Sequence, residues 1–82
     1  MELIDTIDGM TNADYKERFK AEYQQLCIRR NKLAYIIEKY ADRKLEFELD
    51  TPINVLKDQW THMTRYMDTL SERAKYEGIN LD

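Results

Sequence analysis

A basic cluster near the middle of the chain is the feature best suited to binding chemistry. It consists of Arg29, Arg30 and Lys32. Arginine presents a planar fork of N–H donors that binds a phosphate or a carboxylate at two points. Because adjacent residues on a helix point about 100° apart, one arginine can face a packed seam while the other faces outward. An arginine at a core-like position costs stability unless it is paired.

Two interpretations of this cluster remain open. In the first, Glu22 or acids of the second half of the chain pair with the arginines, and the cluster is a structural ion-pair network. In the second, the cluster lines an anion pocket at a seam between subunits, where tyrosines lie close enough to stack on a base. The candidate ligand-binding residues of that pocket are Tyr23, Arg29, Arg30, Arg65, Tyr66 and Arg73, with Tyr35 as a further tyrosine.

The other reactive side chains form no catalytic or metal-binding pattern. His62 is the single histidine and Cys27 the single cysteine, so zinc would lack the several converging ligands that it needs. No Ser/His/Asp or Cys/His arrangement and no glycine-rich phosphate loop occurs. We expect no catalytic residue, no metal and no cofactor, and we predict that the protein is not an enzyme.

Length and composition limit the chain to one small helical domain. A domain of 82 residues buries only about 60% of the surface of its unfolded chain, so a lone monomer is marginal. Two glycines, one proline and 35% charged residues suit helices with few turns. No apolar run approaches the roughly 20 residues that span a bilayer, and the first residues lack the basic region of a signal peptide.

The net charge of −3 hides an asymmetry along the chain. Residues 13–44 contain nine bases and five acids, whereas residues 45–82 contain four bases and eight acids. These segments could attract each other, within one molecule or between copies. Duplex DNA is not an expected partner, because the chain is acidic overall and DNA affinity comes mainly from phosphate neutralisation. A membrane partner is not expected either, since neither predicted helix combines a lysine-rich face with a strongly apolar one.

Apolar spacing predicts a long helix in the second half of the chain. Over residues 53–74, apolar residues follow each other at steps of three and four, which makes a coiled-coil-like heptad seam. Thr51 can cap this helix, and Pro52 suits its first position. Gly78 can end the helix in the left-handed conformation, with Ile79 folding back onto the last turn.

A second long helix is predicted before it. Thr11 or Asn12 can cap this helix, and no glycine or proline interrupts residues 13–44. Apolar residues recur seven apart, with Arg30 standing where the stripe would otherwise be apolar. The two helices, about 12–44 and 52–77, should form an antiparallel hairpin. The predicted core and subunit seam comprises Phe19, Leu26, Leu33, Ile37, Leu56, Trp60, Met63, Met67 and Leu70.

The predicted architecture is all-α. It consists of an N-terminal arm, residues 1–11, and a helical hairpin domain, residues 12–82. Gly9 could end a short helical stretch in the arm, which is either frayed or docked on a neighbouring subunit. Two helices alone leave part of each apolar stripe uncovered, so we predict that hairpins pack into a homo-oligomeric bundle. A monomer closed by the arm is the alternative.

The connection between the helices alternates in character. Leu45, Phe47 and Leu49 are separated by acids, which is a two-residue period. Because no second strand candidate exists to pair with it, we expect an extended segment. Its three apolar side chains should cover the end of the hairpin.

Both helices contain residues in a recognisable order. These are Tyr15-Lys16-Glu17-Arg18-Phe19 with Glu22, Leu26, Arg30 and Leu33, and then Leu56, Gln59, Met63, Tyr66, Leu70, Arg73-Ala74 and Glu77-Gly78-Ile79. In these blocks the chain resembles a family of short bacteriophage and prophage proteins named after a gene of a crAss-like phage. The resemblance spans roughly residues 14–81 and implies a helical fold.

At the level of fold, the predicted hairpin is similar to the small anti-CBASS and anti-Thoeris sponges of phages, which sequester cyclic-nucleotide immune signals between subunits. The similarity implies a phage accessory protein in the cytoplasm of the infected bacterial host. It would counter immunity by holding a nucleotide-derived signal in an inter-subunit pocket. The expected partners are further copies of the chain and a cyclic or related signalling nucleotide. The alternatives are an anti-CRISPR-like inhibitor or nucleic-acid mimic that binds a host defence protein, and a phage assembly component.

Overall fold

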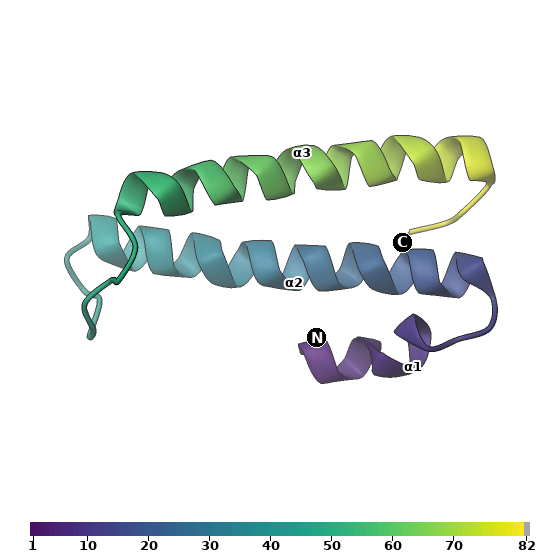
Figure 1. The fold of residues 1–82 in the computed structure, drawn as a ribbon, viewed down its shortest axis with the longest axis horizontal. Coiled ribbons are helices and arrows are strands. Elements are labelled where there is room, and N and C mark those ends of the chain that lie inside the picture. Colours follow the sequence, from purple (N-terminus) through teal and green to yellow (C-terminus); the bar gives the residue numbers. More distant parts are fainter. Residues whose placement is uncertain (82) are drawn as a thin grey trace.

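The computed structural model describes residues 1–81, and every regular element in that range is helical (Figure 1). The elements are the 3-10 helix η1 (Leu3–Thr6) and the α-helices α1 (Ile7–Met10), α2 (Tyr15–Ala41) and α3 (Ile53–Glu77). The long helices α2 and α3 lie side by side and run in opposite directions, while the arm lies along the first half of α2 (Figure 1). The all-α prediction is therefore confirmed. None of the described helices is long and apolar enough to cross a membrane.

Helix α3 ends where the sequence predicted. Gly78 adopts the left-handed conformation with φ 68°. The backbone N–H of Ile79 donates to the carbonyl of Ala74 at 2.9 Å, and both side chains are buried. The predicted cap by Thr51 is wrong, because Pro52 is the residue that flanks the helix and no side chain caps it. With Pro52 extended outside the first turn, Thr51 is one residue too far from the free N–H groups.

Helix α2 is shorter than predicted at both ends. Its cap is Asp14, whose side chain accepts the Lys16 N–H at 2.9 Å, and the predicted cap by Thr11 or Asn12 is wrong. Asn12 instead accepts the backbone N–H of Asp14 at 2.9 Å and turns the chain before the helix. At the other end, Arg43 adopts φ 58° without being a glycine. The left-handed residue stops the helix before residue 44.

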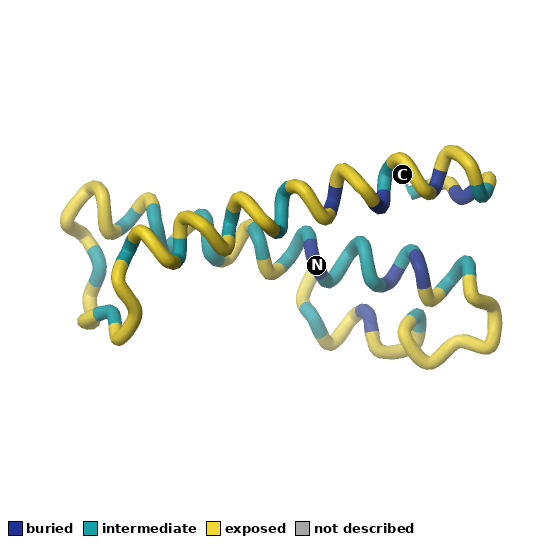
Figure 2. Tube along the Cα trace, turned by 45° about the horizontal axis from the view of Figure 1, so that its top comes forward, coloured by how far each residue is buried: buried dark blue, intermediate teal, exposed yellow. Residues whose placement is uncertain are grey.

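The arm is packed against α2 of its own chain, which contradicts the frayed-arm interpretation (Figures 1 and 2). Thr6 is only 1% exposed, and its hydroxyl accepts the Gln25 amide N–H at 2.9 Å. Gly9 lies inside α1 and does not end it. A Cβ on Gly9 would come within 2.8 Å of the Ala21 Cβ, so glycine is what allows the arm to approach α2.

The buried core lies at the end of the molecule where α2 begins and α3 ends (Figure 2). At the other end, the predicted seam residues Leu33, Ile37, Leu56 and Trp60 are only partly buried. The chain exposes 6256 Å², compared with about 5,200 Å² for a compact monomer of its mass. The core consists of Phe19, Leu26, Met67, Leu70, Ala74 and Ile79.

The connection covers the hairpin end only in part. Leu45 and Leu49 are half-buried, but Phe47 is 58% exposed, so the prediction that all three side chains cover the end is wrong. The chain bends at Glu46 and Phe47. The bends break the two-residue period that would have placed the three side chains on one face.

Candidate functional site

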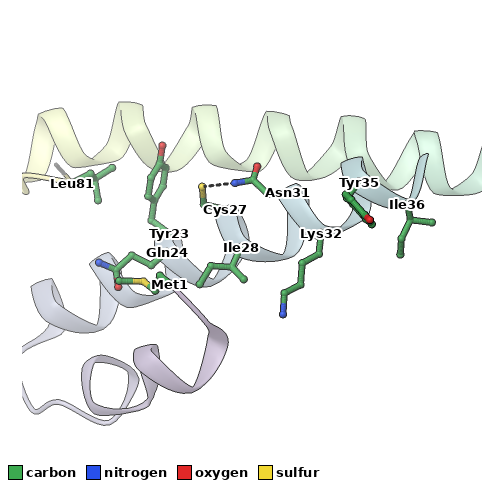
Figure 3. A pocket seen from close by; sticks show the side chains of 10 residues that line it. All are labelled: Met1, Tyr23, Gln24, Cys27, Ile28, Asn31, Lys32, Tyr35, Ile36 and Leu81. Atoms are coloured by element: carbon green, nitrogen blue, oxygen red, sulfur yellow. Dashed lines mark hydrogen bonds between the residues drawn. The ribbon is translucent and has the colours of Figure 1, made fainter. Parts of the chain in front are cut away.

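A groove of about 630 Å³ runs along α2 between the first residue of the arm and the C-terminal tail (Figure 3). Its volume falls within the range of small-molecule sites. Met1 and Leu81 approach it from the two terminal segments. The residues that line this α2 groove from the helix itself are Tyr23, Gln24, Cys27, Ile28, Asn31, Lys32, Tyr35 and Ile36.

The groove combines tyrosine rings with an apolar floor. Tyr23 is half-buried against the core, whereas Tyr35 is 60% exposed. The Lys39 Nζ lies 5.3 Å from the centre of the Tyr35 ring, which makes a cation–π contact. Ile28 and Ile36 supply aliphatic surface between the rings and the end of the groove. A flat aromatic ligand can stack in such a site.

One cation lies at the edge of the groove. The Lys32 Nζ lies 3.1 Å from a carboxylate oxygen of Glu2 in the arm, and both side chains are more than half exposed. Exposed pairs of this kind contribute only about 0.2–1 kcal/mol, so an incoming anion can compete with the carboxylate. Arg29 is exposed one helical turn before Lys32 and adds positive charge nearby.

Amide side chains supply the remaining polar groups of the groove. The Asn31 Nδ2 donates to the Cys27 Sγ at 3.7 Å, which is a weak hydrogen bond. Gln24 and Asn31 both line the groove, and Figure 3 shows the Asn31 amide turned toward Cys27. Amides both donate and accept, so they can read the edge of a base.

Arg30 lies at the contact between α2 and α3. Its guanidinium carbon is 5.8 Å from the centre of the Trp60 ring, and its buried Nε has no hydrogen-bond partner. Among the ion pairs of residues 1–81, none involves Arg29 or Arg30. Glu22 instead accepts a hydrogen bond from the Tyr66 hydroxyl. Seven or eight residues along a helix span about 10–12 Å, which is too far for Glu22 to reach either arginine.

The other predicted site residues lie on α3, away from the groove. Arg73 stacks on Phe19, with its guanidinium carbon 4.9 Å from the ring centre, and its Nε lies 3.0 Å from Glu77. Arg65 and Tyr66 are exposed. Of the six predicted ligand-binding residues, only Tyr23 lines the α2 groove. A single site that joins these six residues across subunits stays a prediction.

Sequence reasoning named Lys32 and Tyr35 but missed the stripe that connects them. Gln24, Ile28, Asn31 and Tyr35 follow each other at steps of four, three and four, which places them on one helix face. That spacing indicates a second face of α2, separate from the apolar seam. The contributions of Met1 and Leu81 had no such signal, because the folding of the terminal segments brings them to the groove.

No metal site accompanies the groove. Over residues 1–81, no three His, Cys, Asp or Glu side chains converge where a metal ion could bind. His62 and Cys27 lie on different helices, the first exposed and the second at the groove. The chemistry available in the groove is therefore stacking, hydrogen bonding and attraction of an anion.

Comparisons with known proteins place the chain in a family. Neither the comparison with curated proteins nor that with solved structures found a match. A protein-family model described as Sequestin matches residues 13–76, which is more than three-quarters of the 82-residue chain. The matched residues include all of α2 and nearly all of α3, and they contain every groove residue that α2 contributes. The chain therefore belongs to the Sequestin family.

Proposed function

We propose that this chain is a non-enzymatic phage accessory protein that sequesters a nucleotide-derived signal of bacterial immunity. The family name implies binding and withholding of a partner molecule. The observation that supports a nucleotide is the α2 groove, where Tyr35 offers an exposed ring beside the cation of Lys32. A base and a phosphate are the two parts of a nucleotide that such neighbours bind.

Each part of the ligand has a partner in the proposed complex. The base stacks on Tyr35, and its edge hydrogen-bonds to the amide of Asn31, one helical turn away. The phosphate lies at Lys32, with Arg29 adding long-range attraction. Ile28 extends the apolar surface of the groove beyond Lys32. Stacking on one aromatic side chain contributes about 1–3 kcal/mol per base.

A second copy of the chain completes the proposed site. Small-molecule sites bury about 70–90% of their ligand, whereas Tyr35 and Lys32 at the α2 groove are both more than half exposed. The excess exposed surface of the chain and the partly buried seam at the loop end favour self-association. In the proposed assembly, a neighbouring subunit closes the groove. The exposed side chains of Arg65 and Tyr66 then contact that subunit.

Calorimetric titration with cyclic dinucleotides and cyclic trinucleotides tests the proposal. Tyr35→Ala and Lys32→Gln should each weaken binding by about tenfold or more, since each removes one of the two main ligand contacts. Matched controls are Tyr76→Ala and Lys75→Gln, which make the same changes at exposed positions of α3. An absence of heat with every nucleotide would refute the proposed function.

A second measurement separates sequestration from turnover. Nucleotide released by denaturing the complex should elute unchanged in chromatography, because the Cys27 thiol in the groove is bonded to the Asn31 amide and not to a general base that would activate it. Cleaved nucleotide would contradict the non-enzymatic role. Recovery of a host defence protein from lysate, without bound nucleotide, would instead favour recognition through the exposed acids Glu46, Glu48 and Asp50.

A further inference from the structure

The backbone of the arm is held in a fixed position beside the α2 groove. Thr6 is buried and bonded to Gln25, and Gly9 lies against Ala21. At the start of η1, the Glu2 backbone N–H donates to the Asp5 carboxylate at 2.8 Å. These contacts anchor the arm, while the side chain of Glu2 is 70% exposed and reaches Lys32.

The side chain of Glu2 forms an ion pair with Lys32, the cation of the groove. Its carboxylate lies 3.1 Å from the Lys32 Nζ, although the two residues are 30 positions apart in sequence. Lys32 is the one cation among the described groove residues, so an anion that binds in the groove competes with Glu2 for its ammonium group. Glu2 therefore stands where the phosphate of a ligand would bind.

We propose that Glu2 is a specificity-determining residue of the groove: its resident carboxylate competes for Lys32, so that only an anion that binds this ammonium group more strongly than a carboxylate, such as a phosphate, displaces it. With Glu2 in place, Lys32 presents little net charge to a weakly charged ligand. A phosphate group has more acceptor oxygens than a carboxylate and makes stronger charge-assisted bonds, so it displaces Glu2, which turns outward into solvent. A single carboxylate only matches Glu2 and gains nothing from the exchange.

This selection rests on the proposed nucleotide site, but it comes from a different part of the chain. The arm lies outside residues 13–76, the part matched by the family model. Residues of α2 supply the stacking surface, whereas the arm supplies the competing charge. The affinity for bases and the discrimination between anions are thus separable properties.

The experiment compares Glu2→Gln with Asp8→Asn, which removes the same charge from an exposed arm residue with no contact to Lys32. Calorimetry is performed with a cyclic dinucleotide, with a neutral nucleoside and with inorganic pyrophosphate. Glu2→Gln should tighten binding of the two phosphorylated probes by about two- to fivefold, the range set by an exposed ion pair. It should leave nucleoside binding unchanged. The gain should vanish when Lys32→Gln is present in the same chain.

The outcomes distinguish this inference from the proposed function. Equal effects of Glu2→Gln and Asp8→Asn, or a gain that persists without Lys32, would overturn the role of Glu2, because either result means that only overall charge matters. Pyrophosphate has no base, so it reports on Glu2 and Lys32 even if no nucleotide binds. A pyrophosphate gain without nucleotide binding would refute the proposed function and support the role of Glu2. Pyrophosphate binding that is unaffected by Glu2→Gln would overturn that role.

Discussion

Replacing Thr6 with valine should release the arm and leave the α2–α3 pair intact. The Thr6 hydroxyl accepts from the Gln25 amide at 2.9 Å and donates to the Leu3 carbonyl at 2.7 Å. Valine keeps the shape of the side chain but removes both hydrogen bonds, and it leaves the amide of Gln25 without this partner. Because an unsatisfied buried group costs about 1–3 kcal/mol, we expect arm docking to weaken by about 2 kcal/mol.

Native-state hydrogen exchange measures this change directly, since the arm can open without global unfolding. The backbone amides of Thr11 and Asn12 donate to carbonyls within the arm and report on its opening. A loss of about 2 kcal/mol should raise their exchange rate about 30-fold, while amides around Leu70 keep their wild-type rates.

Thr69→Val is the matched control for this experiment. Thr69 is exposed on α3, and its hydroxyl donates to the Arg65 carbonyl at 3.1 Å. The control should leave arm exchange unchanged because it makes the same chemical change far from the arm. Arm exchange in Thr6→Val that is as slow as in Thr69→Val would refute the reasoning, since it would mean that the hydroxyl of Thr6 does not anchor the arm.

Three further substitutions test the packing. Leu70 is 1% exposed, so Leu70→Ala should lower the free energy of unfolding in denaturant by about 2–5 kcal/mol, whereas Val55→Ala at a 48% exposed position should change it little. Arg30→Met removes a buried Nε that has no partner and should leave the free energy of unfolding equal or higher; a clear loss would show that the guanidinium is paired. Gly9→Ala should push the arm from α2 and speed its exchange, and Ala21→Gly in the same chain should reverse this gain, because the clash is between these two Cβ positions.

The long helices could be predicted because their signals are local. The heptad steps over residues 53–74 and the glycine at position 78 act within a few residues, and α3 ends at Glu77 as expected. The left-handed residue that stops α2 could not be predicted, since Arg43 adopts φ 58° without the usual glycine. Several side chains can cap or stop a helix, and the surrounding fold selects among them.

The kinds of side chain in the candidate site were predictable, but the particular residues that come together there were not. Lys32 and Tyr35 were recognised as a cation and a stacking ring, but Arg30 turned toward Trp60 and Glu22 bonded to Tyr66. A helical stripe specifies which residues share a face. It does not specify which face another segment covers, because that depends on how well distant surfaces fit together.

By itself, the sequence determined that this chain forms two long helices with one apolar seam each, since hydrophobic periodicity and the glycine that ends α3 operate over a few residues. Only the tertiary structure decided that the arm lies along α2 and that Glu2 faces Lys32 across 30 positions of sequence. The physical reason is that such contacts depend on the close approach of Gly9 to Ala21 and on a hydroxyl buried at Thr6. Neither feature leaves a periodic trace in the order of residues.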